Sequence, residues 1–313
     1  MPKEKPPEPN YGPATPEEMQ PAIEESGYLL EGRVTRLMGT RGFFVETNAF
    51  TPDPTEPGKA IETDVIGKCF EFVNEENKDT VTASVLVECK NNSQPFAFFM
   101  QRPQLPELND VRIHYGGFPS FSLDQDTGVQ VPIHKLLDMK AWHHYCNAQE
   151  VATQFCGFKW TNEQKPREKR EWKAEPMEQY SKAFSRLAIV TASDSTDSAG
   201  PLPCIQMQMS YPVVVFQGLI YCVEDENGKA KITSADRLQL HHSATVAGRL
   251  ILVQIDVVTE ATFPQLMEDI LAELKVLRDR IQGLYPKLLQ SAIDQKMAAS
   301  QRRARGVLGG ITI

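Results

Sequence analysis

The sequence has few cysteines, and none of them forms a CxxC pair. Six cysteines are spread along 313 residues. Zinc knuckles and thioredoxin-like redox sites need two cysteines separated by two residues. The spacing therefore excludes these classes and favours a cytosolic protein with reduced thiols.

A secretory signal and long apolar runs are also missing. The chain starts with polar residues and prolines and has no apolar signal-peptide core. The longest apolar stretches, residues 211–223 and 250–258, contain Gln217 and Asp256 and fall short of the ~20 residues that a membrane helix needs. We expect buried strands there, no membrane contact and a cytoplasmic protein.

The chain has no excess of basic residues. Lysine and arginine number 33 against 41 aspartates and glutamates, and the net charge is −8. Extended, non-specific nucleic-acid surfaces are usually basic, so this balance counts against one. A magnesium site needs carboxylates, however, and local lysine or arginine clusters can still contact phosphates.

The first hundred residues predict the order helix, strand, strand, strand. Residues 1–14 are rich in proline and are expected to form a disordered arm, and Thr15 and Glu18 form a capping box. A helix is expected from Ser26, with Leu30, Val34, Leu37 and Met38 on its apolar face. Strands are expected at residues 43–46, 60–72 and 80–90, the last two joined by a polar turn.

The rest of the chain predicts further helices and strands. Helices are expected at residues 141–158, 177–192 and 263–299, and strands at 213–216, 219–223 and 249–258. Asn227-Gly228 is typical of a hairpin turn. The apolar seam from Leu266 to Leu284 fits either packing on the sheet or the seam of a homodimer. Residues 301–313 are expected to form a basic, flexible tail.

Two charged side chains stand at the end of the third predicted strand. In residues 85–90 the sequence is Val-Leu-Val-Glu-Cys-Lys, and alternation along a strand places Glu88 and Lys90 on the same face. Asp64 lies on the preceding strand. If the strands pair about a turn centred near Glu76, Asp64 lies opposite Glu88. Two converging carboxylates attract a hard divalent cation.

This arrangement suits hydrolysis of a phosphodiester bond. Bound Mg²⁺ lowers the pKa of a water molecule and neutralises developing charge. Lys90 can orient the water and stabilise the pentavalent state. The main-chain carbonyl of Cys89, between Glu88 and Lys90, is a natural third ligand beside Asp64 and Glu88.

The Glu-x-Lys pattern alone has little specificity, and a surface ion pair is the alternative. The same pattern occurs at Glu76/Lys78, Glu163/Lys165, Glu171/Lys173 and Glu273/Lys275. Only Glu88/Lys90 follows an apolar, β-branched run and has a strand-borne aspartate at hairpin distance.

These residues resemble the PD-(D/E)xK, or restriction-endonuclease-like, nuclease superfamily, and its Mrr-like type in particular. The motifs are Gly42-Phe43-Phe44-Val45-Glu46, Glu62-Thr63-Asp64-Val65 and Val87-Glu88-Cys89-Lys90, with Glu31 on the preceding helix. The resemblance covers about residues 28–92. It implies an α/β fold with a mixed central sheet flanked by helices, to which the sequence adds a long C-terminal helix. One nuclease-like domain would span residues 15–300, with an insertion around 95–210.

The resemblance also implies the function and the roles of the residues. Asp64 and Glu88 would bind Mg²⁺, with Mn²⁺ as a substitute, Lys90 would position the water, and Glu31 would be an auxiliary acid. The expected protein is an endonuclease acting on DNA. The alternatives are a catalytically silent nuclease-like module that binds nucleic acid or a protein partner, and a hydrolase of smaller phosphate esters.

A pair of histidines followed by two cysteines could suggest a zinc site. His143-His144 together with Cys146 and Cys156 fits no structural zinc spacing. We expect a packed helix with a histidine pair at its edge.

Overall fold

The computed structural model covers most of the chain. The described residues are 14–92, 94–103, 113–118, 121–123, 129–161, 171–194, 205–246, 248–290 and 293. The predicted arm (all but residue 14) and the predicted basic tail lie outside them. None of the described helices has the length and apolar character needed to cross a membrane.

Two helices open the described chain. In α1 (Pro16–Glu25) the predicted capping box is present: the Thr15 hydroxyl accepts from the Glu18 main chain, and the Glu18 carboxylate accepts from the Thr15 main chain. Helix α2 (Tyr28–Thr40) buries Leu30, Val34 and Met38, which recur at helical spacing as predicted.

Three antiparallel strands follow: β1 (Phe44–Pro52), β2 (Ala60–Asn74) and β3 (Asp79–Asn91). Val65 pairs with Val87 and Phe72 with Thr80. This is the register predicted from a turn centred near Glu76, since the only shift lies beside the turn. The next residues along the ladder are Asp64 and Glu88, so the two carboxylates project from the same face of the sheet.

A parallel strand lies against β3 on its other side. Helix α4 (Glu178–Asp194) precedes β10 (Gln206–Gln217), which pairs in parallel with β3 over its whole length. Strand β14 (Arg249–Thr259) pairs in parallel with β10. The helix predicted at residues 177–192 is therefore confirmed, and it directly precedes the strand that completes the centre of the sheet.

The sheet is mixed and has twelve strands in the described part of the chain, in the order β1-β2-β3-β10-β14-β13-β8-β4-β11-β12. Strands β5 and β9 pair with β10 and β8 outside this path. The remaining strands of the sheet are β4 (Phe96–Gln101), β5 (His114–Gly116), β8 (Val151–Thr161), β9 (Glu171–Glu175), β11 (Ile220–Glu226), β12 (Lys229–Ala235) and β13 (Arg237–Val246). The predicted hairpin turn joins β11 to β12, and Asn227 and Gly228 both have positive φ, at 58° and 80°.

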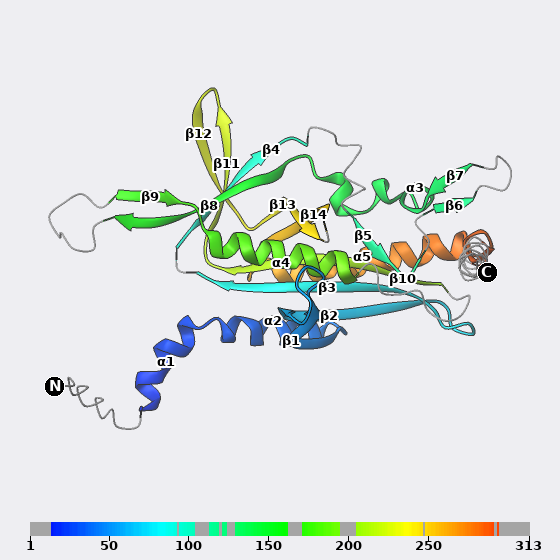
Figure 1. Cartoon of the computed structure of the whole chain (residues 1–313), viewed down its shortest axis with the longest axis horizontal. Coiled ribbons are helices and arrows are strands. Elements are labelled where there is room, and N and C mark those ends of the chain that lie inside the picture. Colours follow the sequence, from blue (N-terminus) through cyan, green and yellow to red (C-terminus); the bar gives the residue numbers. More distant parts are fainter. Residues whose placement is uncertain are drawn as a thin grey trace, which may run out of the picture.

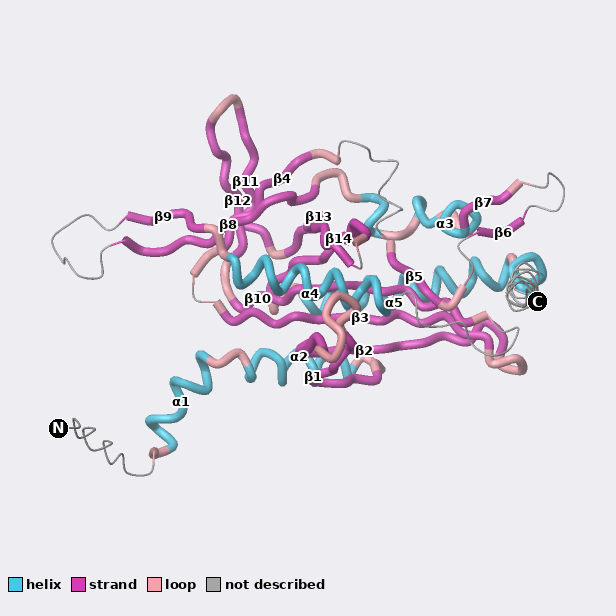
Figure 2. Tube along the Cα trace, viewed as in Figure 1, coloured by secondary structure: helices cyan, strands magenta, loops and turns pink. Residues whose placement is uncertain are grey.

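The two-stranded ribbon of β6 (Phe121–Leu123) and β7 (Gln130–Pro132) and the short helix α3 (Ile133–Leu136) lie together at one end of the molecule (Figures 1 and 2). The 3-10 turns η2 (Met139–Ala141) and η3 (His144–Asn147) follow α3 along the chain.

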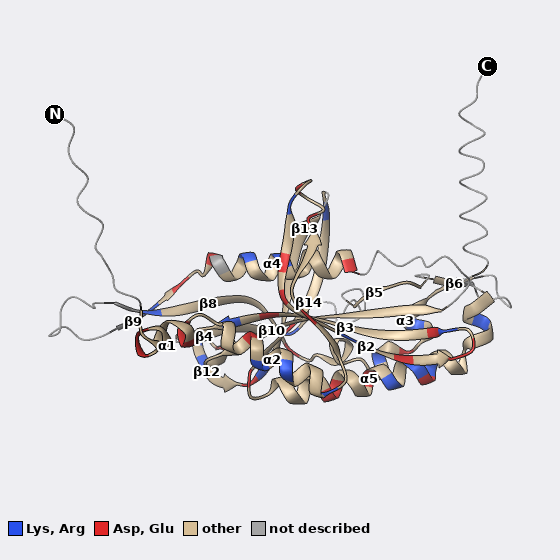
Figure 3. Cartoon of the chain, turned by 90° about the horizontal axis from the view of Figure 1, so that it is seen from below, with Lys and Arg blue, Asp and Glu red and all other residues tan. Residues whose placement is uncertain are grey.

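Helices cover both faces of the sheet. Seen from the edge of the sheet, α4 lies on one side, and α2 and α5 (Phe263–Gly283) lie on the other (Figure 3). Lysine, arginine, aspartate and glutamate are interspersed on the outer surfaces of these helices (Figure 3). The α/β class with a mixed central sheet flanked by helices, expected from the sequence, is thus observed.

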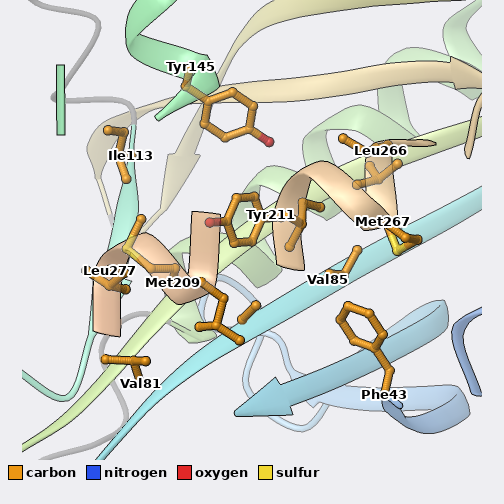
Figure 4. Packing of buried hydrophobic residues seen from close by; sticks show 14 of the residues in the cluster. Phe43, Val81, Val85, Ile113, Tyr145, Met209, Tyr211, Leu266, Met267 and Leu277 are labelled. Atoms are coloured by element: carbon orange, nitrogen blue, oxygen red, sulfur yellow. The ribbon is translucent and has the colours of Figure 1, made fainter. Parts of the chain in front are cut away.

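Each face has its own hydrophobic core. Side chains of α2 and α5 pack on one face, and side chains of α4 pack on the other. In Figure 4, Tyr211 and Val85 from neighbouring strands lie beside Leu266 and Met267 of α5. Burying each large apolar side chain contributes about 2 kcal/mol. The apolar seam of α5 packs on the sheet of its own chain, which is the first of the two arrangements expected from the sequence.

Two sequence-based expectations about elements are wrong. Residues 141–158 form the end of η2, the 3-10 turn η3 and then β8, not a helix. Val151 and Ala152 are buried because β8 is an interior strand flanked by β13 and β4, and Tyr145 of η3 is buried in the core on the α5 side. The helix predicted at residues 263–299 ends at Gly283, and a separate helical segment follows over residues 285–290. Pro286 lacks an N–H and clashes with the preceding turn, which explains the break.

Candidate functional site

Asp64, Glu88 and Lys90 come together beside α4, on one face of the interior strands β2 and β3. They line a pocket of about 380 Å³ with Glu62 of β2 and Tyr180, Ala183 and Arg186 of α4. Alternation along β2 and β3 sends the three predicted side chains to the α4 face, while Val65 and Val87 between them pack in the opposite core. The strand pattern thus provides both the apolar anchor and the polar site.

The Lys90 ammonium is held by three oxygen atoms. Its Nζ lies 2.7 Å from Glu88 Oε2, 3.2 Å from the Cys89 carbonyl oxygen and 3.6 Å from Asp64 Oδ2. These oxygens belong to the three residues predicted as metal ligands. They therefore converge on one cationic position, which Lys90 fills in this structure.

The main chain of β3 fixes the Asp64 side chain. The Cys89 amide donates a hydrogen bond of 2.7 Å to Asp64 Oδ2. Hydrogen bonds to a carboxylate are stronger than those between neutral groups, so this contact holds Asp64 across the gap between the two strands.

Burial and neighbouring charge determine the protonation of the site. Burial, opposed by Lys90 and supported by the Asp64 carboxylate, raises the pKa of Glu88 to about 7. Glu88 is only 6% exposed. Burial alone would lower the pKa of Lys90, but the charges of Glu88 and Asp64 prevail and raise it. Lys90 is therefore an ammonium at neutral pH, and Glu88 can exchange a proton in that range.

The oxygen set fits a hard divalent cation. Two carboxylates and a main-chain carbonyl are ligands that Mg²⁺ accepts, with water molecules completing its octahedron. Because the Lys90 ammonium contacts all three oxygens, a metal at this position requires Nζ to withdraw by one side-chain rotation. Lys90 would then stand beside the metal, which is the place its predicted role demands.

Glu31 lies near these groups but outside the pocket lining. Burial and the Asp64 carboxylate raise its pKa, while Lys90 lowers it. The end of α1 lies beside the end of β3, where the Asn91 side chain donates to the Glu24 carbonyl at 2.8 Å. Gly27, which caps the start of α2, also lies next to Asn91. The start of α2 thus brings Glu31 within electrostatic reach of the site.

Glu46, the acid of the first strand motif, has a different position. It is exposed on β1 and pairs with Ile66, away from the pocket lining.

The sequence did not indicate the α4 side of the site. Tyr180, Ala183 and Arg186 follow one another at intervals of three along α4, so they share one helix face. Arg186 lowers the pKa of Glu88 through its charge. The spacing was visible on a predicted helix, but nothing in the sequence told which strands that helix would cover.

Searches of the chain against protein-family models, against curated proteins and against solved structures each found no match.

Proposed function

We propose that this protein is a Mg²⁺-dependent endonuclease acting on DNA through Asp64, Glu88 and Lys90. The observation that carries the proposal is the convergence of Asp64 Oδ2, Glu88 Oε2 and the Cys89 carbonyl on one cationic position. A strand-borne lysine beside two acidic ligands is the arrangement that the PD-(D/E)xK resemblance implies.

The order of the elements supports the proposal. The superfamily core consists of a helix, three strands, a second helix and a further strand. Here α2, β1, β2 and β3 come first, and α4 and β10 follow, with β10 parallel to β3. Helix α4 has the place in the order that the resemblance requires of the second helix. The segment between β3 and α4 contributes β4 and β8 to the same sheet.

The residues of the chain have distinct tasks in this proposal. Asp64, Glu88 and the Cys89 carbonyl would hold Mg²⁺, or Mn²⁺ in its place. The ion would supply a water molecule of lowered pKa and neutralise charge on the phosphate. Lys90 would orient that water and stabilise the charge that develops on the phosphate oxygens. Glu31 would act as an auxiliary acid from α2.

A cation for the phosphate backbone is present on the α4 side. Arg186 lines the pocket and is exposed, so its guanidinium can reach a bound phosphate. Arg33 of α2 is bound to Glu260, with Nε 2.5 Å from Oε1. Contact with DNA from Arg33 would require exchange of that partner, so Arg186 is the stronger candidate.

Plasmid cleavage with Mg²⁺ or Mn²⁺ tests the proposal. Wild type is compared with Asp64→Asn and Lys90→Met, which keep the size of the side chain and remove its charge. Glu46→Gln and Lys59→Met are matched controls at exposed positions outside the pocket lining. We expect cleavage by wild type and both controls, and a loss of at least 100-fold in the two site variants.

Two results would contradict the proposal. Equal cleavage by all five proteins would mean that the activity arises elsewhere. No cleavage of supercoiled, linear duplex or single-stranded DNA by wild type would favour the silent binding module, which the net charge of −8 suits if its partner is a protein.

A further inference from the structure

A second cluster of polar side chains lies on the opposite face of the sheet. His143 and His144 precede and begin η3, and their rings stack with centroids 5.2 Å apart. Glu273 comes from α5 and Asp256 from β14. These four residues are buried or nearly so, on the side of the sheet where α5 and its core residues pack.

Three of these residues can direct ligand atoms to one point. Ligand atoms of His143, His144 and Glu273 lie within 4.8 Å of one another. His144 Nδ1 is 2.8 Å from Glu273 Oε1, and His143 Nδ1 is 3.9 Å from Glu273 Oε2. Two imidazoles and one carboxylate form a ligand set typical of zinc and of related transition metals.

The outer contacts of this cluster resemble those that support metal ligands. His144 Nε2 is 2.9 Å from Asp256 Oδ2, and a carboxylate at one ring nitrogen orients the other toward a metal. That other nitrogen, Nδ1, faces Glu273 Oε1 here, and a metal would take the place of the proton between them. The Tyr211 hydroxyl donates to Glu273 Oε2 at 3.2 Å. His143 Nδ1 accepts from the Tyr145 amide at 3.2 Å, so binding a metal through this nitrogen requires His143 to give up that hydrogen bond.

Burial adds to the case for a functional site. Asp256 is 0% exposed and is paired with the His144 ring and, at 3.6 Å, with Arg237. Buried ionisable groups gathered in this way are concentrated at functional sites.

The cluster is open on one side. A pocket of about 590 Å³ is lined by His144 and Glu273, with Asn147, Arg237, Gln239 and Asp269 among its other walls. A bound ion would therefore have an open position for water or a small ligand, as catalytic metal sites do.

We propose that His143, His144 and Glu273 form a second metal site, for a divalent transition metal of the Zn²⁺ class. Its nitrogen ligands distinguish it from the oxygen-lined site of Asp64 and Glu88, which favours Mg²⁺. The spacing of the two histidines with Cys146 and Cys156 had argued against a structural zinc motif, and neither cysteine belongs to the group of ligands proposed here. The third ligand comes from α5, which no local motif could reveal.

Titration with Co²⁺, an absorbing substitute for Zn²⁺, tests the proposal. The protein used is the full chain carrying Asp64→Asn and Glu88→Gln, so that the first site cannot bind the ion. We expect one bound Co²⁺ with visible d–d absorption, without an intense near-ultraviolet thiolate band, and displaced by Zn²⁺.

Variants added to this background identify the ligands. Glu273→Gln keeps the size of the side chain and should weaken Co²⁺ binding at least tenfold, and His144→Ala should weaken it further. Cys222→Ser, at a thiol that lines the same pocket, should bind Co²⁺ as the parent does. Circular dichroism shows whether each variant remains folded.

Three results would overturn the proposal: no d–d absorption in the parent, a thiolate band, or unchanged affinity in folded Glu273→Gln. Because Asp64 and Glu88 are already replaced, these outcomes do not depend on the nuclease proposal. Likewise, failure of plasmid cleavage leaves this metal-binding experiment intact.

Discussion

Replacing Glu88 by glutamine should change how the stability of the protein depends on pH. The folded state raises the pKa of this carboxyl from an ordinary value of 4.5 to about 7, chiefly through burial. A raised pKa means that the folded state binds the proton more tightly than the unfolded state. The stability associated with protonated Glu88 is therefore complete below pH 4.5 and is lost as the pH rises through about 7.

The size of the effect follows from the shift. A change from 4.5 to about 7 corresponds to about 3 kcal/mol in total, of which about 2 kcal/mol falls between pH 5 and pH 8. Glutamine does not titrate. The free energy of unfolding of Glu88→Gln should thus increase relative to wild type by about 2 kcal/mol across that range.

Urea unfolding followed by circular dichroism, in EDTA and at several pH values, measures this difference. The Lys90 charge remains on both proteins throughout, so its altered pairing shifts the curves by a constant and does not change their relative slope. Glu46→Gln, which removes an exposed carboxylate from β1, should follow wild type. If wild type and Glu88→Gln run parallel from pH 5 to pH 8, the inferred burial and charge coupling of Glu88 are wrong.

Three further substitutions test other parts of the structure. Lys90→Met should bind Mg²⁺ about tenfold more tightly than wild type in calorimetry, because the ammonium contacts the same oxygens as the metal would. The variant should nevertheless fail to cleave DNA, and weaker Mg²⁺ binding would contradict the proposed ligand set. Leu274→Ala should lower the free energy of unfolding by about 2–5 kcal/mol, since this side chain of α5 is 1% exposed; a loss below 1 kcal/mol in urea unfolding would mean that α5 is not anchored on the sheet. Gly67→Ala should destabilise by about 1 kcal/mol or less, because the added methyl group meets the flexible end of the Met38 side chain, which can turn aside; a loss above about 3 kcal/mol in urea unfolding would mean that Met38 cannot move.

The first site could be predicted from the sequence because it depends on short-range rules. Side chains alternate along a strand, which put Glu88 and Lys90 on one face. The turn between β2 and β3 is short, so the pairing of Asp64 with Glu88 could be worked out by counting. The apolar spacing on α2 and the Asn227-Gly228 turn were readable for the same reason.

The helix expected at residues 141–158 was wrong because the spacing of buried apolar residues does not tell a helix from an interior strand. Tyr145, Val151 and Ala152 recur at intervals that suit one face of a helix, but Tyr145 belongs to η3 and the other two belong to an interior strand, which buries them just as fully.

The sequence by itself determined the local elements, the register of the β2–β3 hairpin and the meeting of Asp64, Glu88 and Lys90. Only the tertiary structure placed α4 and Arg186 over that site, and only it carried Glu273 from α5 to the two histidines of η3. The physical reason is that parallel pairing and helix packing join segments far apart in the chain. Such contacts depend on how all the buried faces fit together, and no spacing along the chain encodes them.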